Sequence, residues 1–355
     1  MSEQATPPPA TTPPLDEHQR VEAAAAQTGR TESSFARMMK SSAGRNLGLV
    51  IALVVLLIVG VATAGDRFAS LDNMLTILRF ASVIGVVSIG MTFVIIGGGI
   101  DLSVGAIVAL ASVWATTLAT QTLAEDTTWL VMVFTALAVG TGCGVVNGAL
   151  IAYGRLAPFI ATLAMLAAAR GLAEIISERR TQIVDVNEFV DFFGGSLLGI
   201  PVLIWIFALV SAVGWVLLNR TTFGRRTISV GGNSVAARLA GINVQRHTLL
   251  LYTLLGFACG IAAIMIIART TTGSSTHGLL YELDAIAAVV IGGTLLTGGR
   301  GTIVGTVFGV LIFATLTNVF TLNNLDTSTQ AVAKGVIIVL AVLLQQRVAA
   351  RDRSG

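Results

Sequence analysis

The chain has 355 residues, of which 54% are hydrophobic and only 12% are charged, and its mean hydropathy is +0.83. The surface of a soluble protein is about 25–35% charged, so this composition cannot cover a water-facing exterior. Leu, Ile, Val and Ala dominate without a Gly-X-Y or heptad repeat, which excludes disorder, collagen and coiled coil for the chain as a whole. The remaining fold class is an all-α polytopic membrane protein.

The charge and the cysteines exclude further classes. The formal net charge is +3, the pI is near 9.2, and 22 residues are basic. In a membrane protein these residues are better explained by cytoplasmic loops and anionic lipid headgroups than by nucleic acid. The two cysteines, Cys143 and Cys259, both lie in apolar stretches without a CxxC motif. Their spacing predicts neither a disulfide framework nor a metal site.

Composition divides the chain into three parts. Five of the seven prolines fall between Pro7 and Pro14, and a polar, alanine-rich run follows them. This composition predicts that residues 1–45 form a disordered cytoplasmic tail. Residues 46–347 are expected to form the transmembrane domain, with a long cytoplasmic loop at 220–247. Residues 348–355 are expected to form a cytoplasmic C-terminal tail.

Ten apolar segments are long enough to be candidate transmembrane helices. They lie at 47–65, 82–98, 102–119, 129–153, 158–176, 199–218, 249–268, 283–296, 302–321 and 330–345. The segment at 283–296 is short and flanked by glycines, so it is expected to be broken or partly inserted. Residues 71–80 are amphipathic and are expected to lie at the membrane interface.

The basic residues give the orientation of these segments. With ten transmembrane helices and both termini cytoplasmic, thirteen basic residues fall on the inner side and five on the outer side. This bias follows the positive-inside rule, and with nine or eleven helices the basic residues would no longer concentrate on one side.

Residues 96–105 read Ile-Gly-Gly-Gly-Ile-Asp-Leu-Ser-Val-Gly. Three consecutive glycines do not continue a helix comfortably, and Asp101 is placed to cap the next helix. One interpretation is a tight, capped cytoplasmic turn. The other is a hinge or gate in which Asp101 and Ser103 contact a substrate or a partner. The residues assigned to this turn are Gly97, Gly98, Gly99, Asp101 and Ser103.

A related pattern occurs later in the chain. Gly98, Gly99, Val104 and Gly105 recur 200 residues on, at positions 298, 299, 304 and 305. Four matches among abundant residue types could be chance or a duplication. Segments interrupted by glycine in two halves of a membrane protein indicate a transport path.

Residues 96–105 resemble the hallmark of permease subunits of ribose/xylose/arabinose/galactose-type ABC importers. The resemblance continues in the order of that family over about residues 46–347, through blocks at 144–148, 157–163, 231–242 and 291–301. It implies a ten-helix permease in a bacterial cytoplasmic (inner) membrane, used as a homodimer or with a sister permease as a heterodimer. The other implied partners are a cytoplasmic ABC ATPase, which would bind ATP and Mg²⁺, and an extracytoplasmic sugar-binding protein.

The 220–247 loop contains five arginines and no acid. Within it, Asn233 and Gly241 suit the two caps of a short helix. Such a helix is marginal in water, so it either lies on anionic headgroups or is held by a partner. The resemblance implies a coupling helix seated on the ATPase, and Ala237→Glu is the substitution that the sequence alone suggests as its test. The residues assigned to ATPase coupling are Gly232, Asn233, Ala236, Ala237, Arg238, Leu239 and Gly241.

The chain lacks the motifs of an ATPase. It has no GxxxxGK[ST] phosphate-binding sequence and only two lysines, Lys40 and Lys334. Its three histidines are isolated from one another and from nucleophiles. We therefore expect no catalytic residue, no metal site and no cofactor bound by this chain.

Candidates for the translocation path are fewer. Pro158 suits a helix start, and Phe159 beside it is either a packed side chain or a gate. The resemblance places the region between the fourth and fifth segments near a dimer axis, where Phe159 would be the gate. Thr162 and Asn147 would offer hydrogen bonds to hydroxyl groups, and Asn318 would either line the cavity or bond across helices. Arg170 and Glu174 are spaced to neutralise each other, and Lys334 is placed to extend towards the interface.

These features predict the membrane permease of an ATP-driven importer for a pentose, hexose or related polyol. The alternative is a secondary sugar transporter driven by a proton or sodium gradient. Such a transporter usually needs a relay of buried carboxylates, and the apolar segments contain few acids. A channel or a membrane scaffold is a third possibility, but neither needs a basic loop with a capped helix.

Overall fold

The computed structural model describes residues 42–351. Asn46–Gly355 forms one compact unit by its backbone contacts. Nearly all of the predicted N-terminal tail and the last four residues lie outside the described part. The predicted C-terminal tail begins at 348, whereas the last helix continues through Arg351.

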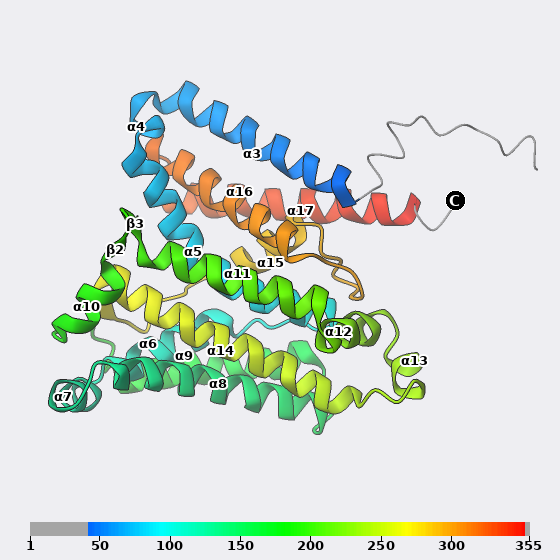
Figure 1. The fold of residues 1–355 in the computed structure, drawn as a ribbon, viewed down its shortest axis with the longest axis horizontal. Coiled ribbons are helices and arrows are strands. Elements are labelled where there is room, and N and C mark those ends of the chain that lie inside the picture. Colours follow the sequence, from blue (N-terminus) through cyan, green and yellow to red (C-terminus); the bar gives the residue numbers. More distant parts are fainter. Residues whose placement is uncertain (1–41, 352–355) are drawn as a thin grey trace, which may run out of the picture. The chain divides into compact units, whose positions relative to one another are not determined.

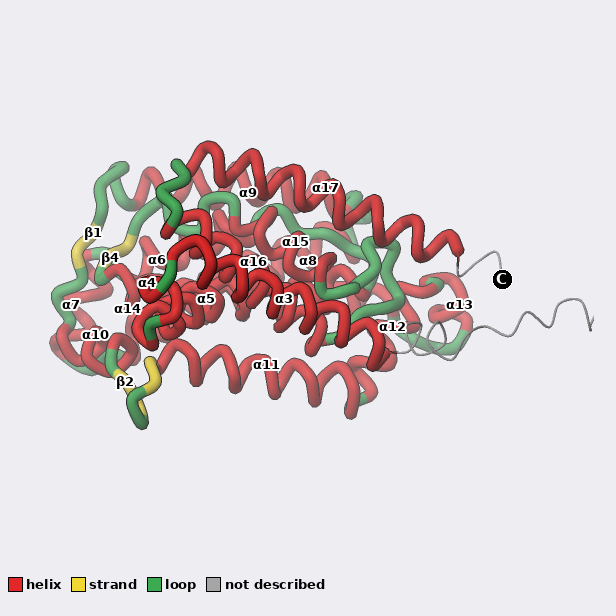
Figure 2. The backbone as a smooth tube through the Cα atoms, turned by 90° about the horizontal axis from the view of Figure 1, so that it is seen from above, coloured by secondary structure: helices red, strands yellow, loops and turns green. Residues whose placement is uncertain are grey.

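The described part is almost entirely helical, as Figures 1 and 2 show. Its first helices are α3 (Ser42–Ala64), α4 (Asp66–Ala69), α5 (Leu71–Ile96), α6 (Val104–Ala115), α7 (Leu118–Asp126), α8 (Leu130–Ala152), α9 (Pro158–Ile176) and α10 (Asn187–Gly194). The others are α11 (Val202–Arg220), α12 (Thr222–Gly232), α13 (Ser234–Leu239), α14 (Val244–Thr270), α15 (Tyr281–Ile291), α16 (Ile303–Leu322) and α17 (Thr327–Arg351).

Two short antiparallel strand pairs connect helices. Strand β1 (Gln182–Ile183) pairs with β4 (Thr272–Gly273), with Gln182 opposite Gly273. Strand β2 (Ser196–Leu197) pairs with β3 (Ile200–Pro201) in the hairpin before α11.

Each of the ten predicted segments contains one of these helices. Among the described residues, seven helices are long and apolar enough to cross a membrane, and α6 with α7 forms an eighth candidate bent by 54°. The chain is therefore a polytopic helical protein. The segment expected to be broken, 283–296, contains the eleven-residue α15, which ends before Gly292.

Two predicted boundaries were wrong. The helix predicted at 82–98 begins earlier, at Leu71, because Ser70 caps a helix that runs without a break to Ile96. The interfacial position of residues 71–80 stays a prediction. No glycine or proline interrupts this helix before Gly85, so the amphipathic turns continue directly into the apolar ones. The 220–247 segment is not one loop around one short helix either, because α12 occupies its first half.

The core lies around α5 and α14. The apolar windows of these helices are 89% and 72% buried, whereas those of α3, α9 and α11 are 11–22% buried. Helix α5 packs against α11, α14 and α16. The outer helices expose apolar side chains such as Ile58, Ile160 and Leu209, which suits lipid or another apolar partner.

Helices α8 and α14 approach each other through glycines. A Cβ atom at Gly140 would lie 2.5 Å from the carbonyl oxygen of Gly256, and one at Gly144 would lie 2.4 Å from that of Tyr252. Both distances are too short for any side chain. Small residues at this interface let the two backbones touch.

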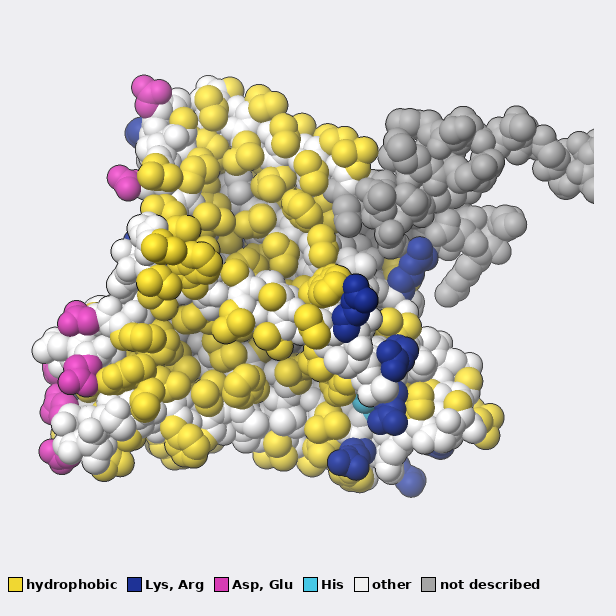
Figure 3. Space-filling view, in the orientation of Figure 1, with side chains coloured by type: hydrophobic (Ala, Val, Ile, Leu, Met, Phe, Trp, Pro, Cys, Tyr) yellow, Lys and Arg dark blue, Asp and Glu magenta, His cyan; other side chains and the backbone are white. Residues whose placement is uncertain are grey.

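Charged side chains gather at the two ends of the helices. Figure 3 shows the arginines over α12 and α13, and the acids over α7 and α10. We call these the arginine end and the acidic end. Between them the visible face is mostly apolar, as expected for a surface that contacts hydrocarbon.

Candidate functional site

Three glycine segments meet near the arginine end and form what we call the glycine junction. It comprises Gly97–Gly99 after α5, Gly231–Gly232 at the end of α12, and Gly298–Gly299 before α16. The backbone N–H of Gly299 donates to the carbonyl oxygen of Ile96 at 2.8 Å. A Cβ at Gly298 would lie 3.0 Å from the Cα of Gly98. The two copies of the repeat seen in the sequence therefore contact each other.

The junction requires glycine for two reasons. Gly98 and Gly298 both have φ near +85°, a conformation that other residues rarely adopt. Gly231 has an ordinary backbone, but a Cβ there would lie 1.7 Å from the carbonyl oxygen of Ile96. Main-chain atoms from three distant parts of the sequence are thus in direct contact, which leaves little room for independent movement.

The turn after the junction is held by a buried polar cluster. One carboxylate oxygen of Asp101 accepts hydrogen bonds from the backbone N–H of Ser103 at 2.7 Å and from its hydroxyl at 2.5 Å. The side-chain amide of Asn147 donates to the other oxygen of Asp101 at 3.1 Å and to the Ser103 hydroxyl at 2.9 Å. The three residues are at most 1% exposed.

These contacts correct the prediction that Asp101 caps the next helix. The residue that caps α6 is Ser103, and its side chain makes no capping bond, whereas Asp101 fixes the backbone just before it. The phenol of Tyr252 on α14 adds a hydrogen bond to the carbonyl oxygen of Ile100 at 3.3 Å. The geometry is that of a tight turn in which Asp101 and Ser103 are hydrogen-bonded, while the buried side-chain oxygen of Asn147 has no hydrogen-bond partner among the described residues. A gating role for Asp101, Ser103 or Asn147 stays a prediction.

Helix α13 follows the glycine junction directly and has the two predicted caps. The side-chain oxygen of Asn233 accepts from the backbone N–H groups of Val235 and Ala236 at 3.0 and 2.9 Å. At the other end Gly241 has φ +83°, and its N–H donates to the carbonyl of Arg238 at 3.0 Å. These bonds satisfy backbone groups that a six-residue helix would otherwise leave unpaired.

The two faces of α13 differ. Val235 and Leu239 are 65% and 86% exposed, and Arg238 is exposed beside them. Ala237 is 4% exposed and faces the protein. The exposed face therefore offers two apolar side chains and a cation to a partner, while Ala237 fixes the helix in place.

Helix α12 was missed by the sequence analysis, although it carries a signal. The hydroxyl of Thr221 accepts from the N–H of Gly224 at 3.4 Å, which is an N-cap. Thr227, Val230 and Gly231 then face inward, and the Thr227 hydroxyl lies 2.9 Å from Nε2 of His247. Three glycines lower the helix propensity of this segment, so the sequence did not predict a helix there. Tertiary contacts support the helix in the structure.

The predicted path residues do not form one group. Thr162 is fully buried and its hydroxyl donates to the carbonyl of Pro158 on its own helix at 2.9 Å, while Phe159 is 58% exposed. Asn318 forms a reciprocal amide pair with Asn73, at 2.8 and 3.2 Å. This pair lies at the start of α5, at the opposite end of that helix from the Asp101 turn. Asn318 thus bonds across helices, one of the two roles left open.

The charged residues within apolar segments have other partners than their spacing predicts. Glu174 pairs with Arg179 at 3.1 Å, and not with Arg170. Nη1 of Arg170 instead donates to the backbone carbonyls of Ser275 and His277. Lys334 pairs with Asp284 of α15 at 3.3 Å.

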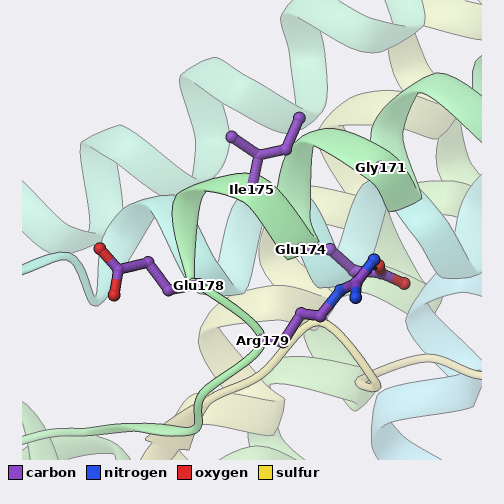
Figure 4. Close-up of a pocket in the computed structure, with 5 residues that line it drawn as sticks. All are labelled: Gly171, Glu174, Ile175, Glu178 and Arg179. Atoms are coloured by element: carbon purple, nitrogen blue, oxygen red, sulfur yellow. Dashed lines mark hydrogen bonds and ion pairs between the residues drawn. The ribbon is translucent and has the colours of Figure 1, made fainter.

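A pocket of about 460 Å³ opens on α9 near these residues (Figure 4). It is lined by Gly171, Glu174, Ile175, Glu178 and Arg179. Figure 4 shows the carboxylate of Glu174 meeting the guanidinium of Arg179, while Ile175 and Glu178 point in other directions. A second, shallow hollow is lined only by apolar residues of α3.

The fold and this site define a class of protein, a polytopic helical membrane protein with an exposed, capped helix at its arginine end. The glycine junction joins this helix to the turns between the buried helices. Residues 73–343 match the family described as "Branched-chain amino acid transport system / permease component". The chain belongs to this family of permease components.

Curated relatives agree with the resemblance seen in the motifs. The chain is 39% identical over 302 residues to the ribose import permease protein RbsC of Escherichia coli K12, covering 84% of this chain and 92% of that one. It is 40% identical over 305 residues to RbsC of Bacillus subtilis, covering 85% and 93%. It is 37% identical over 299 residues to the L-arabinose ABC transporter permease protein AraH of Azospirillum brasilense, covering 84% and 87%. No solved structure matches this chain.

Proposed function

We propose that this chain is the membrane-spanning permease subunit of an ATP-driven importer that moves a monosaccharide into the cytoplasm by alternating access. The observation that carries this proposal is the similarity along almost the whole transmembrane domain to permeases named for ribose and L-arabinose import. The polytopic helical fold and the capped helix at the arginine end support it.

The proposal includes an orientation and a location. The positive-inside rule assigns the arginine end to the cytoplasm and the acidic end to the outside. Ten transmembrane helices with both termini cytoplasmic agree with this assignment, if α6, α15 and α17 each contribute to a crossing. The location is then the cytoplasmic membrane of a bacterium.

The proposal also includes partners. A separate cytoplasmic ATPase would bind ATP and Mg²⁺, so this chain would bind no cofactor and catalyse no reaction. An extracytoplasmic binding protein would deliver the sugar at the acidic end. A second permease copy or a sister permease would complete the membrane part.

Helix α13 would be the contact with the ATPase. Its exposed apolar side chains Val235 and Leu239 suit a groove in a partner. Its caps satisfy its terminal backbone groups, and the buried Ala237 holds it against the protein. Because Asn233 follows Gly232 directly, a movement of α13 would pull on the glycine junction. The junction would pass that movement to the end of α5 and to the segment before α16.

Co-purification tests the proposal. The chain is extracted gently from its native membrane by an affinity tag, and accompanying proteins are identified by mass spectrometry. Recovery of an ABC ATPase subunit in stoichiometric amount is expected. Recovery of the permease without an ATPase, together with sugar uptake driven by a proton or sodium gradient, would contradict the proposal and favour a secondary transporter.

A further inference from the structure

Helix α12 lies across the ends of three long helices. A Cβ atom at Gly224 would overlap a carbonyl oxygen in the last turn of α11. One turn later, the Thr227 hydroxyl lies 2.9 Å from Nε2 of His247, in the first turn of α14. Near the end of α12, a Cβ at Gly231 would overlap the carbonyl oxygen of Ile96, the last residue of α5. Because α5, α11 and α14 are each long and apolar enough to cross a membrane, a helix that touches their ends in successive turns lies along the membrane surface.

The side of α12 that faces away from the protein is basic. Arg225 and Arg226 are exposed, and the exposed Ile228 follows Arg225 by three residues, which places the two on the same side of the helix. The 220–247 segment contains five arginines and no acid. Among the described residues, neither Arg220 nor Arg225 forms an ion pair. A helix along a membrane surface with arginines and an apolar side chain outward is typical of binding to anionic headgroups.

The last residue of α11 continues an exposed apolar stripe of that helix. Leu209, Val213 and Val216 are exposed, and Arg220 follows them at the same spacing of three or four residues. Residues with this spacing share one side of a helix, so Arg220 stands where the apolar stripe ends. Its guanidinium lies 5.4 Å from the centre of the exposed Trp215 ring. Tryptophan beside a cation is typical of the boundary between hydrocarbon and headgroups.

We call four exposed residues the basic corner: Trp215, Arg220, Arg225 and Ile228. We propose that the basic corner binds the headgroups of anionic phospholipids. Headgroup phosphates accept hydrogen bonds from the guanidinium groups, and the acyl chains lie along the apolar stripe of α11. Because Gly231 follows Arg225 by less than two turns on the same helix, bound lipid holds α12 in place at the glycine junction.

The position of the basic corner favours lipid over the ATPase as its partner. The apolar stripe of α11 adjoins the corner on the membrane side, and Figure 3 shows the arginines at the edge of a mostly apolar face. Helix α13, the proposed contact with the ATPase, begins only after the glycine junction. Lipid binding itself does not depend on the proposed function, whereas an effect of lipid on ATP-driven uptake rests on it.

Native mass spectrometry of the purified chain tests lipid binding without transport. The probes are phosphatidylglycerol, which is anionic, phosphatidylcholine, which is zwitterionic, and inorganic phosphate. The Arg220→Gln/Arg225→Gln variant should retain at least about tenfold less phosphatidylglycerol than the unaltered chain, whereas both should bind phosphatidylcholine weakly and equally. Arg155→Gln/Arg246→Gln removes two exposed arginines elsewhere at the arginine end, and this matched control should retain phosphatidylglycerol.

Two results of this experiment would overturn the proposal. One is retention of phosphatidylglycerol by the basic-corner variant at the level of the control. The other is loss of the lipid from the unaltered chain when inorganic phosphate is added, which would indicate a site for free anions.

Reconstitution with the ATPase and the binding protein tests the consequence for transport. Uptake of ribose, L-arabinose or D-fructose by the unaltered protein should be at least about threefold faster in liposomes that contain phosphatidylglycerol than in phosphatidylcholine alone. The Arg220→Gln/Arg225→Gln variant should keep the ATPase but lose this response. Loss of the ATPase from the variant would assign these arginines to the ATPase contact, and an unchanged response would remove lipid from coupling. Absence of ATP-driven uptake by the unaltered protein in either lipid would contradict the proposed function, while the mass-spectrometric result would stand.

Discussion

At the scale of single residues, the structure separates positions that must be glycine from positions that only happen to be glycine. Gly231 and Gly232 are adjacent at the end of α12, yet their surroundings differ completely. A Cβ at Gly231 would lie 1.7 Å from the carbonyl oxygen of Ile96, whereas one at Gly232 would meet nothing within 4 Å. The sequence does not show this difference, because Ile96 is more than 130 positions away from both glycines.

Gly231→Ala should therefore disrupt the glycine junction. Forcing a methyl group into close-packed backbone costs about 1–3 kcal/mol, and here it also separates α12 from α5. We expect a lower thermal unfolding temperature in detergent and a loss of ATP-driven uptake. Gly232→Ala is the control and should resemble the unaltered protein in both measurements. Equal effects of the two substitutions would show that the contact at Gly231 has no special role.

The Asn73–Asn318 pair gives a second prediction at this scale. Because each amide donates to the other, Asn318→Ala should lower the free energy of unfolding by about 0.5–1.5 kcal/mol without lowering uptake by the folded protein. A double-mutant cycle with Asn73→Ala should show that the two effects are not additive. If Asn318→Ala left stability unchanged and slowed uptake, Asn318 would belong to the translocation path instead.

At the scale of elements, short helices and irregular turns determine how the long helices are connected. Helices α12 and α13 contain eleven and six residues, and α13 depends on its caps rather than on length. Helix α15 is too short to cross a membrane alone, so the irregular residues 274–280 accompany it. These segments lie between the apolar helices that a hydropathy window detects.

A substitution on the exposed face of α13 tests its contact with a partner, whereas one on the buried face does not. Ala237→Glu, the substitution suggested by sequence alone, would bury a charge against the protein and unseat the helix, so loss of function there would not identify a partner contact. Leu239→Glu is more informative because its side chain is 86% exposed. It should abolish co-purification of the ATPase and ATP-driven uptake while leaving thermal stability unchanged.

A matched control exists at the other end of the molecule. Leu118, the first residue of α7, is 81% exposed, and Leu118→Glu makes the same change away from the arginine end. It should leave ATPase co-purification intact. Retention of the ATPase by the Leu239→Glu variant would remove α13 from the contact.

The sequence predicts elements well where their signal is local. Apolar runs located a helix in each of the ten predicted segments, and Asn233 with Gly241 located α13, because capping depends on residues a few positions apart. The sequence did not predict α12, the continuity of α5 or the partners of Arg170. The partners of Arg170 and the support of α12 depend on contacts between residues that are distant in the chain, such as Arg170 with Ser275 and Thr227 with His247. The continuity of α5 has a local signal instead, the Ser70 cap and the lack of glycine or proline before Gly85.

At the scale of the whole molecule, one arrangement connects the features described above. The arginine end carries α13, the glycine junction joins it to α5 and to the segment before α16, and the acidic end lies near the pocket on α9. In the proposed importer, ATP would act at the first end and sugar would enter at the other. The buried helices α5 and α14 form the stable frame between them.

ATP-driven sugar uptake is the most direct test of this arrangement. The permease, its co-purified ATPase and the binding protein are reconstituted in liposomes, and uptake of labelled ribose, L-arabinose and D-fructose is measured with ATP or with imposed proton and sodium gradients. We expect uptake of at least one sugar that requires ATP and persists when ionophores collapse both gradients. Uptake that needs a gradient and ignores ATP would contradict the importer assignment.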